Sequence, residues 1–294
     1  MIHAFSVDVE DWYQVSDFEE IVEFSAWGWY ESRVIGNTER ILGMLAEARV
    51  KATFFVLAWN AERHPALPRM IAAAGHEIAT HGYAHRLAYD IGREAFRADV
   101  ERSKKLLEDL TGREVLGYRA PSFSITARSL WAIDVLLDLG FRYDSSILPV
   151  RDQLYGIPQA HRFPYLISRD GQSLTEFPVS TVRCAGRTLP LGGAYLRVLP
   201  YAYTRWGFRR LEAASQPALI YLHPWELDPA HPRLRVRGKR GVSTHYLRLR
   251  STEKKVRRLL AEFPFAPIER VLGLEPARNE ECWADRALTA RGER

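Results

Sequence analysis

Two histidines four residues apart, His81 and His85, have the spacing in this chain that most directly suggests chemistry. Gly82 lies between them, and glycine allows backbone angles that other residues avoid, so both imidazoles can turn toward one point. Imidazole nitrogen is a common zinc ligand, and a catalytic zinc site usually takes three protein ligands and leaves one position for water. The pair therefore predicts a metal site if a third ligand lies elsewhere; an isolated pair of this kind more often makes only hydrogen bonds.

Further polar side chains stand at the ends of apolar segments that are predicted as strands. In chain order they are Asp8, Glu10, Asp11, Arg119, Asp144 and His223. A divalent ion polarises a carbonyl and lowers the pKa of bound water toward about 7, so the remaining groups need only move protons. The set suits hydrolysis of an amide or ester.

The segments that carry these groups alternate between apolar strands and amphipathic helices. Residues 52–57 are continuously apolar, as in parallel strands buried on both faces, and residues 95–110 keep helical spacing. Asn37 and Thr38 are predicted to cap the first helix, and residues 267–272 to form the last strand. The pattern predicts an α/β fold, a distorted (β/α) barrel of about seven parallel strands with its chemistry at the carboxyl ends of the strands.

Length and composition are consistent with one domain over residues 1–294, with 47% hydrophobic residues. Cys184 and Cys282 match neither a metal motif nor a disulfide framework, which favours a reducing compartment. We find no signal-peptide pattern and no apolar run of the roughly 20 residues needed to span a bilayer. These observations predict a cytoplasmic protein.

The net charge of +5 is carried by arginine, most densely in residues 233–240. Guanidinium pairs bidentately with phosphate, so this cluster could bind a phosphate-bearing partner; a solvated loop is the competing interpretation. No nucleic-acid motif or aromatic stacking platform is present, so nucleic acid is not an expected partner. The aromatic-rich stretch 12–30 is predicted to be either a rim over a pocket or ordinary core packing.

Four motifs resemble, in order, the signature motifs of the polysaccharide deacetylases, the NodB-homology or carbohydrate esterase family 4 group. They are Ser6–Asp11, Thr80–His85, Gly117–Ser122 and Tyr221–Pro224. The Asp-Val-Glu-Asp opening, and the segment from Gly192 through His245 to Phe265, are similar to the exosortase-associated (PEP-CTERM) exopolysaccharide deacetylases. The C-terminal extension of that subgroup would lie within residues 180–290.

The resemblance implies a role for each matched residue. His81 and His85 would bind the metal, and Asp8 would be the base that activates the attacking water. Arg119 would hold Asp8 ionised and oriented. His223 would be the acid that protonates the leaving amine.

The third metal ligand stays open, because the sequence departs from the family's Asp-Asp and Asp-x-Asp forms. Glu10 stands in the Asp-x-Asp register and Asp11 one residue later. Alternation along a strand puts Asp8 and Glu10 on one side, which favours Glu10, but a turn beginning there could bring in Asp11. Glu176 is the candidate to hydrogen-bond His223 and raise its pKa.

Other residues are expected to bind substrate or to support the site. They are Tyr83, Pro121, Asp144, Glu176 and Trp225, with His245 as a residue of the extension that could reach the site. Trp225 offers a flat apolar face with a polar edge, which suits a sugar ring. Asp144 could instead be a turn former.

Together these features predict a metal-dependent enzyme that removes N-acetyl groups from a polysaccharide or a lipid-linked oligosaccharide during exopolysaccharide biosynthesis. Zinc is the expected metal, with cobalt or manganese as alternatives, and peripheral contact with the inner face of the membrane is expected. The alternatives are an amidase of the same fold acting on a small linear or cyclic amide, and a non-catalytic carbohydrate-binding protein. The presence of Asp8, Arg119 and His223 argues against the last.

Overall fold

A computed structural model of the protein describes residues 1–152, 155–234 and 244–274. Its main sheet contains β1 (His3–Val9), β2 (Thr53–Val56), β3 (Glu77–Thr80), β4 (Gly117–Tyr118), β5 (Tyr143–Asp144), β6 (Tyr165–Arg169), β7 (Gln172–Glu176), β10 (Leu219–Leu222) and β11 (Phe265–Ala266). A separate hairpin consists of β8 (Thr181–Cys184) and β9 (Arg187–Pro190). The helices are α1 (Val34–Glu47), α2 (Ala58–Arg63), α3 (Ala66–Ala73), α4 (Ala88–Ile91), α5 (Arg93–Thr111), α6 (Trp131–Asp138), α7 (Ala194–Val198), α8 (Tyr201–Ala213), α10 (Leu249–Glu262) and α11 (Ile268–Val271).

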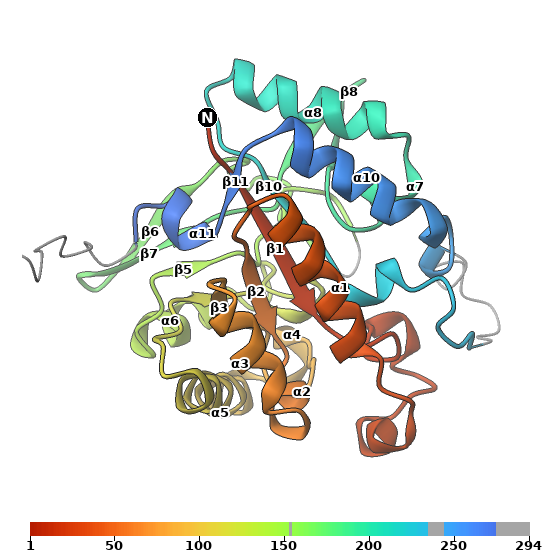
Figure 1. Cartoon of the computed structure of the whole chain (residues 1–294). Helices are drawn as coiled ribbons and strands as arrows, with labels where there is room; N and C mark the ends of the chain where they lie inside the picture. Colours follow the sequence, from red (N-terminus) through yellow and green to blue (C-terminus); the bar gives the residue numbers. More distant parts are fainter. Residues whose placement is uncertain (153–154, 235–243, 275–294) are drawn as a thin grey trace, which may run out of the picture.

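The main sheet is curled, and its strands follow the order β10-β1-β2-β3-β4-β5-β7-β6, with β11 also pairing with β1 (Figure 1). The pairs from β10 to β7 are parallel, and β6 pairs antiparallel with β7. Parallel strands place their carboxyl ends at the same edge of the sheet. The predicted α/β barrel-like fold of about seven parallel strands is therefore confirmed.

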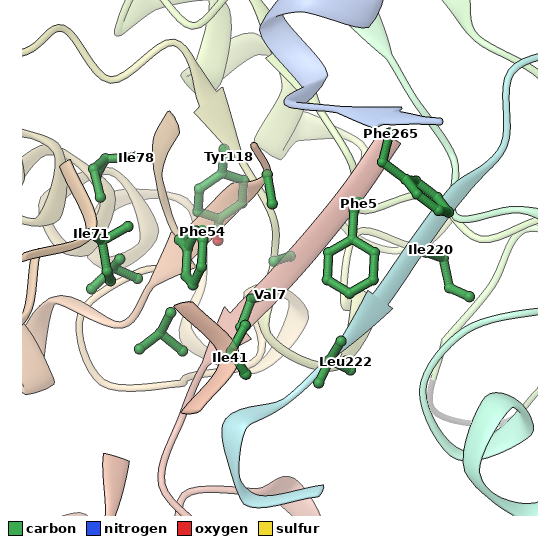
Figure 2. Packing of buried hydrophobic residues seen from close by; sticks show 14 of the residues in the cluster. Phe5, Val7, Ile41, Phe54, Ile71, Ile78, Tyr118, Ile220, Leu222 and Phe265 are labelled. Carbon is green, nitrogen blue, oxygen red and sulfur yellow. The ribbon is translucent and has the colours of Figure 1, made fainter. Parts of the chain in front are cut away.

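Successive side chains of β1 point alternately to the hydrophobic layer outside the curled sheet and to the interior of the sheet. Phe5, Val7 and Val9 belong to the large hydrophobic cluster that also contains Ile41 of α1. Figure 2 shows Phe5 and Val7 on the same side of the sheet as Ile41 and close to β10. The alternate position, Asp8, therefore points to the opposite, inner side, which places its carboxylate at the mouth of the barrel.

The sheet is not closed by a strand ladder between β7 and β10 in the described part of the chain. The segment after β7 crosses this gap instead: the Ser180 amide donates to the Leu219 carbonyl at 3.0 Å, and the Gly193 amide donates to the Tyr221 carbonyl at 2.9 Å. Gly193 has φ +54, and a Cβ there would lie 2.4 Å from the Tyr221 hydroxyl oxygen. Only glycine fits this close approach, which brings the chain across the opening of the barrel.

Two predicted element boundaries are wrong. Helix α1 begins at Val34, so Asn37 and Thr38 lie inside it and do not cap it. The segment predicted as a last strand over residues 267–272 contains the short helix α11 (Ile268–Val271), and the strand β11 lies just before it. None of the helices in the described ranges has both the length and the apolar character needed to cross a membrane.

Candidate active site

A cavity of about 220 Å³, here called the site cavity, opens at the carboxyl ends of β1, β3 and β10. Its lining contains five of the residues predicted to bind metal or transfer protons: Asp8, Glu10, His81, His85 and His223. These residues come from three segments up to about two hundred positions apart in the sequence. The parallel strands bring them together because each follows the end of its strand.

Glu10, His81 and His85 form a compact group of three potential metal ligands, and each is buried. Glu10 Oε1 lies 2.8 Å from His81 Nε2 and 3.1 Å from His85 Nε2. The potential ligand atoms all lie within 4.8 Å of one another. One carboxylate and two imidazoles are a common protein donor set for catalytic zinc, so the residues present fit a divalent ion.

The orientation of His81 also fits metal binding. Its Nδ1 lies 2.7 Å from the main-chain carbonyl oxygen of Arg119. A carbonyl can only accept a hydrogen bond, so Nδ1 carries a proton, and Nε2, the nitrogen that faces Glu10, is the one available to a metal when the ring is neutral. A ring nitrogen held by a backbone carbonyl in this way is the usual arrangement behind a metal-binding histidine.

Gly82 sets the turn that brings the second histidine back toward the first. It has φ +74, and a Cβ there would lie 2.9 Å from Asp99 Oδ1. Asp99, on α5, accepts the amide of Tyr83 at 2.8 Å and fixes the loop. His85 itself has φ 52, so the loop makes two left-handed steps between the histidines. The role predicted for Gly82 is confirmed.

Asp11 faces away from the two histidines and stabilises the loop that follows β1. Its carboxylate accepts the amides of Trp12, Arg33 and Val34 at 3.0, 2.9 and 3.2 Å. It therefore satisfies main-chain donors at the start of α1, where Asn37 was expected to act. Of the two candidate carboxylates, the structure places Glu10 beside the histidines.

The electrostatics of Glu10 favour its ionised form. Burial by itself would raise the pKa of Glu10, but the neighbouring imidazoles of His85, His223 and His81 outweigh burial and hold the pKa well below its usual value. An ionised carboxylate is the form that binds a cation.

Asp8 pairs with Arg119 on the inner side of the barrel. Arg119 is fully buried, and its Nη1 donates to Asp8 Oδ1 at 2.6 Å and to Ser6 Oγ at 2.9 Å. Its Nε and Nη2 donate to the carbonyl and the hydroxyl of Ser145 at 3.2 and 2.9 Å. The Arg119 guanidinium lies 4.0 Å from the ring centroid of Phe55. Contacts on so many sides fix the guanidinium, and through it the orientation of the Asp8 carboxylate.

His223 directly follows β10 and is held by Glu226, three residues later. Glu226 Oε2 accepts the His223 amide at 3.0 Å and lies 3.2 Å from His223 Nδ1. Glu226 Oε1 accepts from Arg197 Nε at 2.9 Å, and Arg197 Nη1 also donates to the carbonyls of Thr244, His245 and Leu247. Glu226 and Arg197 are buried, and the carboxylate fixes Nδ1 as the protonated nitrogen of the ring.

The charges around His223 favour its protonated form. Burial acts to lower the pKa of His223, but the carboxylates of Glu10, Glu226 and Asp8 outweigh it and raise the pKa to about 9. Burial likewise acts to raise the pKa of Glu226, whereas His223 and Arg197 lower it to about 2. The pair is thus an imidazolium and a carboxylate at neutral pH.

The hydrogen bond predicted between Glu176 and His223 is wrong. Glu176 lies at the end of β7, where it accepts the Ile147 amide at 3.0 Å and neighbours Asp144. Burial and the charge of Asp144 raise the pKa of Glu176 well above its usual value, and burial raises that of Asp144 to about 6. The two carboxyls form a buried pair behind Arg119, and Glu226 makes the contact that was assigned to Glu176.

The remaining predicted residues lie at different distances from the cavity. Trp225 lines it, and its ring stacks on His223 at 5.1 Å and on His245 at 4.0 Å between centroids. Tyr83 points elsewhere, donating to Glu62 at 2.5 Å. Pro121 begins a short 3-10 turn whose neighbouring residues, rather than Pro121 itself, line the cavity.

The aromatic-rich stretch after β1 serves both of the purposes considered for it. Trp12, Phe18 and Trp27 are buried in a second hydrophobic cluster that also contains Trp225. Residues 15–17 line the site cavity and form part of its rim. The packing of the aromatic side chains therefore positions the polar rim.

Comparison with known proteins divides the chain into two matched segments. Residues 29–143 match the family described as Polysaccharide deacetylase, and residues 145–273 match a family described as Domain of unknown function (DUF3473). His81, His85 and Arg119 lie in the first segment and His223 in the second. DUF3473 is the C-terminal domain of the PEP-CTERM-associated deacetylases.

Named relatives match a part of the chain. A peptidoglycan-N-acetylglucosamine deacetylase of Bacillus cereus is 34% identical over 98 residues, which are 33% of this chain and 36% of the relative. A chitooligosaccharide deacetylase of Rhizobium leguminosarum bv. trifolii is 31% identical over 33% of this chain and 51% of its own length. A peptidoglycan deacetylase of Helicobacter pylori is 31% identical over 37% and 36%. The chain thus covers well under two thirds of these relatives.

Solved structures share the fold over most of the chain. A Mycobacterium smegmatis protein assigned as a polysaccharide deacetylase superposes with a TM-score of 0.62 at 23% identity, covering 92% of this chain and 88% of the other. The Puue allantoinase gives a TM-score of 0.56 at 18% identity, covering 88% and 82%. At these identities the similarity concerns the fold.

Proposed function

We propose that the chain is a metal-dependent hydrolase of the polysaccharide deacetylase family that removes N-acetyl groups from a glycan; residues 29–143 match that family and residues 145–273 match DUF3473. One observation carries the proposal: three kinds of group meet at one cavity. They are the Glu-His-His group, the Asp8 carboxylate held by Arg119, and the His223 imidazolium held by Glu226. Hydrolysis of an amide needs these three kinds of group: an electrophilic centre, a base and an acid.

Glu10, His81 and His85 would hold the metal, for which we propose zinc, with cobalt or manganese as alternatives. When bound, such an ion supplies Lewis acidity toward the acetyl carbonyl and lowers the pKa of water. His81 is kept in the right tautomer by the Arg119 carbonyl, so the same residue that orients the base also supports the metal site.

Asp8 is the base in this proposal. Arg119 occupies its Oδ1, whereas Oδ2 receives no hydrogen bond from the described residues and is free to take a proton from the attacking water. Fixing the carboxylate beforehand means that no reorganisation is required when the proton moves.

His223 is the acid. Its Nδ1 faces Glu226, so the proton for the leaving nitrogen is carried on Nε2. The hydrogen bond and the charge of Glu226 raise the pKa of His223 and favour the protonated ring. A cation bound at Glu10 would cancel the effect of the Glu10 carboxylate on the pKa of His223, whereas the effect of Glu226 on that pKa would remain. Collapse of the tetrahedral intermediate then releases acetate and leaves an amine on the sugar.

The biological setting is also part of the proposal. The DUF3473 segment supports a role in exopolysaccharide biosynthesis, with a polysaccharide or a lipid-linked oligosaccharide as substrate. We propose a single functional domain over residues 1–294 that works in the cytoplasm at the inner face of the membrane. The arginine cluster 233–240, which suggested membrane contact, lies outside the described residues from position 235 onward.

Acetate release from chains of N-acetylglucosamine tests the function directly. We expect release that stops in chelator and returns with zinc, cobalt or manganese. Glu226→Gln is a useful companion variant, because it alters the acid without touching the Glu-His-His group. Turnover of small linear or cyclic amides without release of acetate would instead favour the amidase alternative, and sugar binding without turnover would favour a binding protein.

A further inference from the structure

A second cavity of about 530 Å³ adjoins the site cavity, and Arg151 and Arg187 lie in its lining; we call it the arginine cavity. Tyr155, Pro190 and Tyr195 line both cavities, so the two cavities are adjacent. The site cavity, at about 220 Å³, is smaller than the roughly 300–1,000 Å³ typical of a pocket that encloses a whole ligand. A substrate that reacts in the site cavity therefore has room to extend into the arginine cavity.

The two arginines lie at two separate turns of the chain. Arg187 follows the turn between β8 and β9, where Ala185 and Gly186 have φ 48 and +75, as in the two-residue turns favoured by hairpins. In the other turn, the Ile157 amide donates to the Leu148 carbonyl at 2.9 Å. Gly156 makes that turn possible, because a Cβ there would lie 2.3 Å from the Val150 carbonyl oxygen.

The arginine cavity has an excess of positive charge. Its charged lining residues are Arg151, Arg187 and one carboxylate, Asp152. Within the described ranges neither arginine forms an ion pair. Arg183 lies on the same hairpin, and its charge adds to burial in lowering the pKa of Arg162 nearby. Arg151 and Arg187 are exposed, so both guanidinium groups can reach an anion that enters the cavity.

We propose that the arginine cavity binds an anionic group, a phosphate or a carboxylate, carried by the glycan at a distance from the acetamido group that reacts. Guanidinium groups pair well with both anions, often with two hydrogen bonds. Tyr155 and Tyr195, between the two cavities, offer aromatic faces to the intervening sugar. This inference rests on the proposed function and assigns its substrate class: a charged rather than a neutral glycan.

The test compares three probes: a neutral chain of four N-acetylglucosamine residues, the same chain with a reducing-end phosphate, and a chain of the same length that ends in a uronic acid. Affinity is measured by calorimetry and acetate release by kinetics. The double variant Arg151→Gln/Arg187→Gln is compared with Arg169→Gln/Arg210→Gln, which removes two exposed arginines that line neither cavity. Melting temperatures check that both variants fold.

We expect wild type to bind at least one anionic probe about tenfold more tightly than the neutral one, an advantage worth about 1.4 kcal/mol. The first variant should lose this advantage through a higher KM, with kcat and turnover of the neutral chain nearly unchanged, and the control variant should keep it. The phosphate and uronate arms identify which anion the cavity takes.

Equal affinities for the three probes in wild type would overturn the inference, as would equal losses on neutral and anionic probes in the first variant. Failure of the proposed function is seen separately, as absence of acetate release from every probe. The calorimetric comparison still decides the inference in that case, because preferential binding of an anionic probe that depends on Arg151 and Arg187 needs no turnover.

Discussion

Glu10→Gln and Asp11→Asn, made separately, should affect two different properties although the residues are neighbours. Glu10 Oε1 lies 2.8 and 3.1 Å from the two imidazole nitrogens, so the amide replaces one of three ligands. Losing an outer partner of a metal ligand typically costs 10–100-fold in metal affinity, so losing the ligand itself should cost more than about 100-fold. Asp11 contacts neither histidine, and its variant should keep the affinity within about threefold.

The expected loss in Asp11→Asn is one of stability, and its size follows from the contacts. Asp11 accepts three main-chain hydrogen bonds with its two oxygens, and asparagine has one oxygen left to accept them. Losing one or two of these hydrogen bonds costs about 1 kcal/mol of stability each. Part of this cost is offset, because burial raises the pKa of Asp11, which means that its buried charge is itself destabilising, and asparagine carries no charge. A net loss of about 1–2 kcal/mol in the free energy of unfolding should lower the melting temperature by about 2–8 °C.

Zinc titration by calorimetry and thermal melting of metal-free protein measure the two effects. The reasoning fails if Asp11→Asn loses zinc and Glu10→Gln retains it, because the ligand would then be the residue that the structure turns away from His81 and His85. It also fails if both variants bind zinc like wild type, since the metal would then lie elsewhere.

Three further expectations concern the proton-transfer groups and the core. Glu226→Gln should move the alkaline limb of the pH–rate profile to lower pH. The Glu226 carboxylate helps to raise the pKa of His223 to about 9, so without it His223 loses its proton at a lower pH. An unmoved limb would mean that another residue is the acid. Asp8→Asn should keep its metal by elemental analysis and lose about 10²–10⁴ in kcat, and full activity would exclude Asp8 as the base. Gly117→Ala should destabilise the protein by about 1–3 kcal/mol in denaturant melts, because the added Cβ would lie 1.9 Å from Cζ of Tyr143; unchanged stability would mean that the ring has room to move.

The parts of the site that could be predicted from sequence depend on regular geometry. The alternation of β1 places Asp8 on the inner side, and parallel strands bring His81 and His223 to the same edge of the sheet. The preference for Glu10 over Asp11 also came from this alternation, although Glu10 lies one residue beyond the end of the strand. These inferences need only the period of the strand and the direction of its neighbours.

The partner of His223 shows where such reasoning stops. Glu176 is the residue that the sequence suggests, but its Oε1 accepts the Ile147 amide and its carboxyl neighbours Asp144, contacts between elements that no local pattern indicates. Glu226 did have a local signal, because it stands three residues after His223 with a proline next to the histidine, as in a capping box. Arg197 had none: its contacts with Glu226 and with the carbonyls near His245 depend on the packing of separate segments.

The position of β1 in the sheet has a consequence for how the chain is made. Ala4 to Val7 pair with β10, and His3 and Ala218 are 215 residues apart in the chain. At a synthesis rate of 5–20 residues per second, about 10–40 s pass between the emergence of β1 and that of its partner. For that time one edge of the strand lacks its hydrogen bonds, and Phe5 and Val7 lack the apolar cover of Ile220 and Leu222 (Figure 2). Exposed strand edges and apolar side chains of two molecules can pair with each other, so we expect refolding from denaturant to yield less soluble protein as its concentration rises.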